Sequence, residues 1–359
     1  MKRIYNFSAG PAILPEEVLQ QASAGVLEID GSGMSILEVS HRGPHYEAIH
    51  HDAESRLLSI LGLNPAEWQP IFLGGGASLQ FAMLPMNFLS ADQSADYVNT
   101  GEWSSKAIKE AKRYGTVNIA ASSESDKFAS IPRELNLSPD AAYLHITTNN
   151  TIEGTEYSDL PSHGKTPLIA DCSSDIFARN IPYNQFHMLY AGAQKNAGPA
   201  GLTIVLVRKD FLETANTNLP TMLSYKTHAA SGSLYNTPPV FSIYVFDLVL
   251  KWIEDRGGLE NMERCNRRKA ALIYDALDEY PDIYDPAVTN KADRSLMNVT
   301  FRLKDKEREA EFLAGAKHRD MDGLKGHRSV GGFRASIYNA FPETGCAALA
   351  AYLREFARS

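Results

Sequence analysis

One lysine, Lys195, stands among small residues in a loop between two strand-like runs. The loop, residues 191–202, reads Ala-Gly-Ala-Gln-Lys-Asn-Ala-Gly-Pro-Ala-Gly-Leu. Close backbone neighbours leave an ammonium group poorly hydrated, which lowers its pKa and makes it an amine that attacks carbonyl carbons. A lysine in an ordinary surface loop is the more common case. Surface loops seldom combine so many small residues around a single charge with buried strands on both sides, however, so the pattern favours a carbonyl-reactive amine at Lys195.

An aspartate, Asp171, ends the apolar run 168–171, one strand and turn before the lysine. Ligands of open α/β sheets bind at the carboxyl ends of the strands, so Asp171 and Lys195 are expected at one edge. A carboxylate that faces a pyridine nitrogen keeps it protonated, and the ring can then accept charge from a carbanion. Capping of the following turn is the alternative role for Asp171.

A glycine-rich turn follows the strand-like run 71–73 and reads Gly74-Gly75-Gly76 before an apolar helical run. The first N–H groups of a helix point outward at its positive end, which makes a phosphate site. A plain strand-to-helix turn is the alternative. The turn lacks the Gly-Lys-Ser/Thr of a P-loop, and Leu79 occupies the third glycine position of a dinucleotide fingerprint. The turn therefore predicts a phosphate site that is not a nucleotide site.

Short strand-like runs alternate with helical runs through the first two thirds of the chain, which favours a mostly parallel sheet covered by helices. Helices are predicted over 45–61 and over 78–89, the second broken by Pro85. After Gly257-Gly258 a long charged helix, 259–280, begins a smaller unit with segments at 297–303, 306–316 and 333–338 and a helix from about Glu343. Strands are predicted at residues 71–73, 96–99, 143–147, 168–171, 188–191 and 202–207.

Composition excludes several classes of protein. The 359 residues carry a formal net charge of −8, which argues against nucleic-acid or anionic-membrane binding. Cys172, Cys265 and Cys346 are too few and too scattered for a disulfide framework or a metal cluster, so no metal is expected. The most apolar run, 240–253, is too short to span a bilayer. The first residues lack the apolar stretch of a signal peptide, and we expect a cytoplasmic protein.

The sequence resembles the phosphoserine aminotransferases, a group of class V, fold-type I enzymes that use pyridoxal 5'-phosphate (PLP). The resemblance runs nearly from end to end and rests on long, specific strings. They lie at residues 7–12, 38–43, 74–80, 191–202, 236–239, 326–328 and 331–340. It implies an α/β large domain, 16–257, with a mostly parallel seven-stranded sheet covered by helices. A smaller α+β domain comprises 1–15 and 258–359, and the enzyme is expected to be a homodimer with shared active sites.

The resemblance also implies the residues that bind the cofactor. Lys195 looks like the Schiff-base lysine, Asp171 like the partner of the pyridine nitrogen and Trp103 like the aromatic stacked on the ring. The other implied contacts are Gly76, Ala77 and Gln194 at the phosphate, Asn236 and Thr237 from the neighbouring subunit, Thr151, and Ser173. Many members carry arginine where this chain has Ala77, so only a backbone contact to the phosphate is expected there. Without the resemblance, Trp103 would be interpreted as a core residue.

The substrate pocket needs cations at two positions, because a phosphorylated oxo acid carries a carboxylate and a phosphate. Arg334 resembles the residue that holds the α-carboxylate. The distal phosphate, or the distal carboxylate of glutamate, is assigned to His41, Arg42, His327 and Arg328. The implied reaction is reversible transamination between L-glutamate and 3-phosphohydroxypyruvate, which gives O-phospho-L-serine and 2-oxoglutarate in serine biosynthesis. The related phosphorylated oxo acid of pyridoxine biosynthesis is a further candidate substrate.

Three alternatives stay open. Another class V aminotransferase would act on small unphosphorylated oxo acids and would need no second anion site. A cysteine desulfurase would need a nucleophilic cysteine on a mobile loop, and none of the three cysteines is so placed. A non-catalytic phosphate-binding protein would use the glycine turn but would give no reason for Lys195.

Overall fold

The computed structural model describes residues 3–359, and a seven-stranded sheet in the order β2-β8-β7-β6-β5-β3-β4 lies at its centre. Its strands are β2 (Trp68–Leu73), β3 (Ser94–Asn99), β4 (Thr116–Ser122), β5 (Leu144–Thr147), β6 (Leu168–Asp171), β7 (Met188–Gly192) and β8 (Thr203–Arg208). β8 runs antiparallel to β2 and β7, and the other neighbouring strands pair in parallel. The predicted mostly parallel sheet is confirmed. With β8 alone reversed, the carboxyl ends of the other strands lie at one edge.

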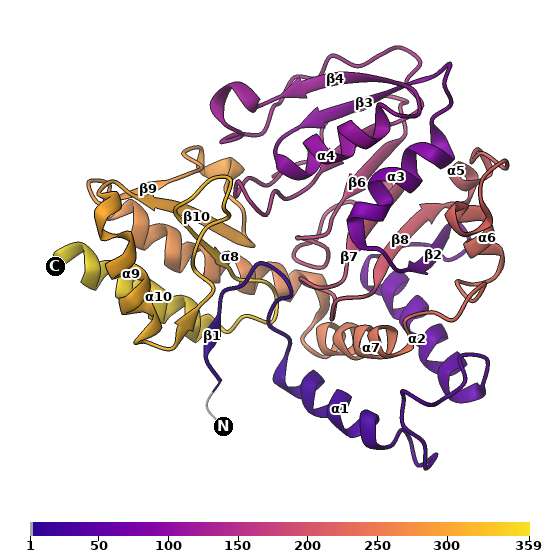
Figure 1. Cartoon of the computed structure of the whole chain (residues 1–359), viewed down its shortest axis with the longest axis horizontal. Helices are drawn as coiled ribbons and strands as arrows, with labels where there is room; N and C mark the ends of the chain where they lie inside the picture. The colour runs from indigo at the N-terminus through magenta and orange to yellow at the C-terminus, as the bar shows by residue number, and fades with distance from the viewer. Residues whose placement is uncertain (1–2) are drawn as a thin grey trace.

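Both faces of this sheet are buried, which explains why its strands are apolar throughout. Along β8, Ile204 and Leu206 face one core, and Val205 and Val207 face the other. In Figure 1, the helices of the first core gather below the sheet, and α3 and α4 lie above them. The first core is closed by α1 (Glu16–Leu27), α2 (Pro44–Ile60) and α7 (Val240–Asp255). The second is closed by α3 (Gly76–Phe88), α4 (Glu102–Ala111), α5 (Lys209–Glu213) and α6 (Tyr225–Ala230).

A smaller α+β unit follows and lies at the left of Figure 1. Its antiparallel sheet has the order β12-β10-β9, and β1 (Tyr5–Asn6) pairs in parallel with β11. Phe7 and Ile13 pack into its core. Its elements are α8 (Gly258–Asp278), β9 (Tyr284–Pro286), β10 (Asn298–Leu303), α9 (Glu309–Lys317), β11 (Met321–Asp322), β12 (Phe333–Ser336) and α10 (Glu343–Arg358). The division into 16–257 and 1–15 with 258–359 stays a prediction, and Met1 and Lys2 lie outside the described residues.

Two local predictions differ from the structure. β4 was missed because it is an edge strand with little buried surface, so its apolar alternation is weak. α3 continues through Pro85 to Phe88, where a break had been predicted. Pro85 lies in the last turn, so its missing N–H costs the helix a single hydrogen bond, and the Leu89 N–H still bonds to the Pro85 carbonyl at 2.9 Å. Across residues 3–359, no helix combines the length and apolarity needed to cross a membrane.

Candidate active site

Lys195 follows β7 at the carboxyl edge of the sheet, and its amine points at a hydroxyl group. Nζ donates a hydrogen bond of 2.7 Å to Oγ1 of Thr151, in the loop after β5. Burial lowers the pKa of Lys195 to about 8, while the negative charge of Asp171 acts in the opposite direction. An amine with this pKa is partly neutral near pH 7 to 8, which is the form that attacks a carbonyl carbon.

Asp171 ends β6 beside this amine and is buried. Its Oδ1 accepts a hydrogen bond of 2.9 Å from the Ser173 N–H, so the carboxylate also caps the following turn. Burial raises the pKa of Asp171, whereas hydrogen bonds from Ser173 and the charge of Lys195 lower it. The Ser173 hydroxyl in turn accepts a bond of 3.1 Å from the Gly192 N–H. Asp171 and Lys195 are therefore held together by the adjacent ends of β6 and β7.

Trp103 lies in the first turn of α4, and its ring centroid is 5.9 Å from Lys195 Nζ. Lys106 Nζ lies 4.4 Å from the same ring. The indole packs against the core beneath α3 and α4, yet its Nε1 is buried without a hydrogen-bond partner in the described chain. Trp103 is thus both a core residue and an aromatic surface facing the lysine.

The glycine turn forms the start of α3 as predicted. Gly75 and Gly76 have φ values of 85° and 65°, which side-chain-bearing residues rarely adopt. No atom lies within 4 Å of a Cβ built on Gly76, so the helix start, with the N–H groups of Gly76 and Ala77, borders open space. The Gly74 carbonyl accepts a bond of 3.3 Å from Thr203, which places the turn beside the strand that follows the Lys195 loop.

The amide of Gln194 folds back over the end of β7. A Cβ added at Gly192 would stand 2.7 Å from Gln194 Oε1, so a side chain there would displace the Gln194 amide. The N-terminal segment covers the other side of this loop, because the Ala12 N–H donates to the Gln194 carbonyl at 2.9 Å. A Cβ on Gly10 would stand 3.5 Å from Lys195 Cγ. Residues 9–12, the covering segment, are not among the predicted site residues.

Arg334, on β12 of the smaller unit, contacts the loop after β5, which Lys195 also contacts through Thr151. Its Nη1 donates to the Thr151 carbonyl at 3.3 Å, and its Nε is buried without a partner in the described chain. Burial lowers the pKa of Arg334, while Glu153 and Tyr338 act in the opposite direction. His327 lines one cavity of about 150 Å³ together with Arg334, and burial and the charges of Arg334 and Arg328 lower the pKa of His327.

Four predicted site residues are not brought to Lys195 within one chain. His41 and the exposed Arg42 lie in the loop before α2, and their side chains have no hydrogen bond to any other predicted site residue described. Asn236 and Thr237 are exposed. Asn236 lines a cavity of about 240 Å³ with Gly74, so this pair lies near the glycine turn but not at the lysine.

A buried polar network supports the site and was missed in the sequence. The Asn149 Nδ2 donates to Ser174 and to Asn298, both at 2.8 Å. The Tyr338 hydroxyl donates to the Ala9 carbonyl at 2.7 Å and so holds the covering segment. The available signal was the polar string Thr-Thr-Asn-Asn-Thr, residues 147–151, directly after the buried run 143–146. Such a string at a strand's carboxyl end indicates a site.

The residues present fit PLP. Lys195 supplies an amine for the aldehyde, the buried Asp171 supplies a carboxylate for a protonated ring nitrogen, and the open helix start at Gly76 offers N–H groups to a phosphate. Between them, Trp103 offers a ring face. In residues 3–359, no group of three or more potential metal ligands is found.

Comparison with known proteins decides the family. The family model described as Aminotransferase class-V matches residues 4–349. The chain belongs to the class-V aminotransferases. Relatives of this aminotransferase match it over its whole length. The phosphoserine aminotransferase of Niallia circulans is 53% identical to it, and that of Desulfosudis oleivorans is 55% identical. Each alignment covers 100% of this chain and 99% of the relative.

Solved structures agree with this aminotransferase in fold. The phosphoserine aminotransferase from Bacillus circulans subsp. alkalophilus superposes with a TM-score of 0.97 at 52% identity, covering 100% of this chain and 99% of that one. The PLP-bound phosphoserine aminotransferase from Trichomonas vaginalis gives a TM-score of 0.91 at 38% identity, covering 98% of this chain and 100% of that one. PLP is accordingly the cofactor of this aminotransferase.

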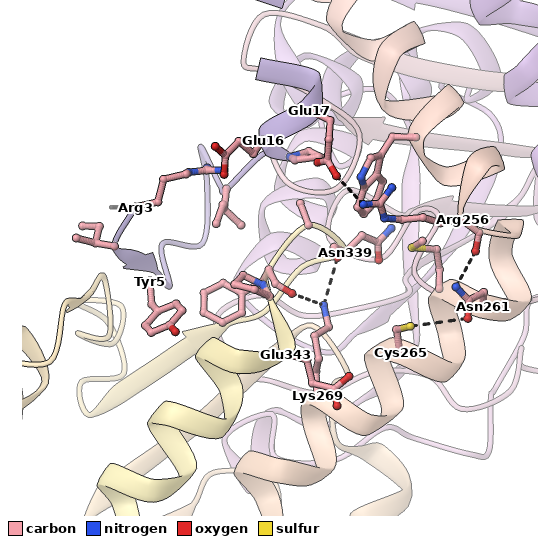
Figure 2. Close-up of a pocket in the computed structure, with 18 residues that line it drawn as sticks. Arg3, Tyr5, Glu16, Glu17, Arg256, Asn261, Cys265, Lys269, Asn339 and Glu343 are labelled. Atoms are coloured by element: carbon pink, nitrogen blue, oxygen red, sulfur yellow. Dashed lines mark hydrogen bonds and ion pairs between the residues drawn. The ribbon is translucent and has the colours of Figure 1, made fainter. Parts of the chain in front are cut away.

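A cavity of about 500 Å³ opens elsewhere, between the N-terminal segment, the junction of α7 and α8, and the start of α10. Figure 2 shows Lys269 at its inner wall and an ion pair between Arg256 and Glu17 at its rim. None of the predicted site residues lines it. This cavity therefore belongs to the contact between the two units of the class-V aminotransferase and not to its active site.

Proposed function

We propose that this class-V aminotransferase moves the amino group of L-glutamate to 3-phosphohydroxypyruvate, giving O-phospho-L-serine and 2-oxoglutarate. The observation that carries the proposal is the buried pairing of Lys195 with Asp171 beside Trp103. Relatives more than half identical over the whole chain bear the name phosphoserine aminotransferase, which supports the substrate.

The chain's own groups would hold PLP at this edge of the sheet. When bound, the protonated pyridine ring accepts the electron density released as a proton leaves the substrate's α-carbon. Asp171 would keep the ring nitrogen protonated, and Trp103 would pack on the ring face. Ser173 fixes Asp171, and the N–H groups of Gly76 and Ala77, with Gln194, bind the phosphate. Asn236 and Thr237 of a second copy reach it from outside.

Lys195 acts as the acid–base group. Its Nζ, with a pKa lowered to about 8, would take the proton from the substrate's α-carbon. The Thr151 hydroxyl, 2.7 Å away, keeps Nζ in place while the proton is carried. The covering segment near Gly10 limits the access of water to Lys195.

The substrates are bound by basic groups at two positions. Arg334 binds the α-carboxylate, because its side chain lies beside Thr151 and so close to Lys195. His327 and Arg328 bind the distal phosphate or the distal carboxylate of glutamate. Within the described chain, the side chains of His41 and Arg42 have no hydrogen bond to the other site residues, which supports a homodimer in which a second copy supplies them.

Two organisational points belong to the same proposal. We place the large domain at 16–257 and the small domain at 1–15 with 258–359, because Phe7 and Ile13 of the N-terminal segment pack in the core of the smaller unit. We also place the enzyme in the cytoplasm. Its buried thiols are expected to stay reduced there, because burial raises the pKa of Cys346 to about 12 and so disfavours the reactive thiolate.

The decisive experiment is transamination by the purified protein with glutamate as donor and a panel of oxo acids. The panel pairs each phosphorylated acid with its unphosphorylated counterpart, and includes the phosphorylated oxo acid of pyridoxine biosynthesis. We expect turnover with 3-phosphohydroxypyruvate to exceed that with hydroxypyruvate by about 100-fold or more, since two anion sites then act. Equal turnover on both acids would favour an aminotransferase for small unphosphorylated oxo acids.

A further inference from the structure

Glu153 is a buried carboxylate that no step above uses. It lies in the loop after β5, just beyond Thr151, with 7% of its surface exposed. Its Oε1 accepts a hydrogen bond of 2.8 Å from the Glu102 N–H, the first residue of α4. Its Oε2 is buried with no hydrogen-bond partner in the described residues. Buried carboxylate atoms without partners are costly, so their presence calls for a physical reason.

The carboxylate lies over the start of α4, and Gly101 makes the room for it. A Cβ added at Gly101 would stand 2.6 Å from Glu153 Oε2. The Ser104 hydroxyl accepts the Gly101 N–H at 2.9 Å from the helix side. The N-terminus of a helix carries partial positive charge, which a carboxylate stabilises. Glu153 therefore fixes the first turn of α4, and Trp103 belongs to that turn.

The same carboxylate acts on Arg334. Both residues line the cavity of about 150 Å³ that also contains His327 and Arg302. Burial raises the pKa of Glu153, while the hydrogen bond from the Glu102 N–H and the charge of Arg334 lower it. The charge of Glu153 in turn stabilises the cationic form of Arg334. Among the described residues, Glu153 is the carboxylate whose charge acts on Arg334, so it competes with the carboxylate of a substrate for that charge.

We infer that Glu153 is a positioning residue that joins the two halves of the site: it sets the pose of Trp103 through α4, and it weakens the hold of Arg334 on α-carboxylates. This inference rests on the proposed function. A weakened hold favours release of product, because an aminotransferase must bind and release a carboxylate at each half reaction.

Two variants separate the two roles. Glu153→Gln keeps an oxygen for the Glu102 N–H and removes the charge. We expect it to lower the KM values for glutamate and for 3-phosphohydroxypyruvate by the same factor, about three- to tenfold, because Arg334 meets the α-carboxylate of both. Glu153→Asp keeps the charge and withdraws it from the Glu102 N–H. We expect near-normal KM values, a lower kcat and an altered visible circular dichroism of bound PLP, since its ring packs against Trp103.

The matched control is Glu110→Gln at the far end of α4, which is expected to change none of these values. Wild-type protein without transaminase activity would defeat the proposed function itself. Active wild type together with unchanged KM values in Glu153→Gln, or the same behaviour in both Glu153 variants, would overturn only the positioning role. If Glu153→Gln does not fold, the Glu153→Asp variant is sufficient: an unchanged kcat and an unchanged circular dichroism in that variant would overturn the positioning role.

Discussion

The backbone N–H of Asn339 donates a hydrogen bond of 2.9 Å to the side-chain oxygen of Asn196, the residue beside Lys195. Asn339 belongs to the smaller unit, and its side chain also donates to the Phe177 carbonyl at 2.9 Å and accepts from Asn266 of α8 at 2.8 Å. Asn339 therefore ties the loop that carries the reactive lysine to the smaller unit.

Lys269 of α8 holds the segment that contains Asn339. Its buried ammonium donates to the carbonyls of Ile337, Tyr338, Asn339 and Phe341, two of these bonds being seen in Figure 2. We expect Lys269→Met to lower the free energy of unfolding by about 3 kcal/mol, because buried carbonyls lose their donor. Urea unfolding measures this, with Lys251→Met on the exposed side of α7 as control. Equal stability of the two variants would contradict the structural role of Lys269.

Lys195→Ala is expected to retain the fold and to lose nearly all turnover. The covalent attachment to PLP should also be lost, because Lys195 carries the amine on which the charge of Asp171 acts and whose pKa burial lowers. Borohydride reduction followed by peptide mass spectrometry identifies the attached lysine in the wild type. Recovery of the adduct at Lys106, which lies 4.4 Å from the Trp103 ring, would reject Lys195 as the attachment point.

The pH dependence of PLP loading follows from the pKa of Lys195, about 8. Only the neutral amine attacks the aldehyde, so the loading rate of cofactor-free protein should rise with pH up to about 8 and level off above it. Asp171→Asn removes a charge that raises this pKa, and its midpoint should fall below that of the wild type. Stopped-flow absorbance measures the loading rate of both proteins against pH. The same measurement with N-acetyl-lysine methyl amide in place of the protein corrects for the titration of the cofactor itself. A higher midpoint in Asp171→Asn would contradict the pairing.

Thr151 contacts Lys195 through its hydroxyl, so the test compares variants with and without that group. Thr151→Val keeps the shape and should lower kcat by about tenfold, which corresponds to one hydrogen bond of ordinary strength. Thr151→Ser keeps the hydroxyl and should stay within about twofold of the wild type. The measurement is the kcat of each variant, from steady-state kinetics of both half reactions. Equal losses in the two variants would point to the methyl group and not to the hydrogen bond.

Gly101→Ala tests the close approach of Glu153 without backbone strain, because Gly101 is extended. The added methyl would stand 2.6 Å from Oε2 and should destabilise the protein by about 1–3 kcal/mol. In the double variant with Glu153→Ala, the cost of Gly101→Ala should fall by at least about 0.5 kcal/mol. Strictly additive unfolding free energies would mean that the two residues do not meet.

The sequence by itself determined those site residues whose position follows from the neighbouring strands, turns and helices in the chain. Asp171 and Lys195 each stand at the end of an apolar strand, and parallel strands bring such ends to one edge whatever the rest of the chain does. The glycine turn was predictable for the same reason, because a strand, a turn and a helix start are adjacent in sequence. Trp103, Asn236 and Thr237 came only from family resemblance.

Only the tertiary structure decided which distant side chains meet. Thr151 and Lys195 come from different strands, and Arg334 comes from a different unit, so their contacts depend on strand order and on how the units pack. Glu153 was invisible in the sequence, because an isolated glutamate carries no periodic or spacing signal. Its partners, Gly101 and Arg334, lie far away along the chain and close only in space. Burial, which alters the pKa values of these groups, is a property of the folded whole.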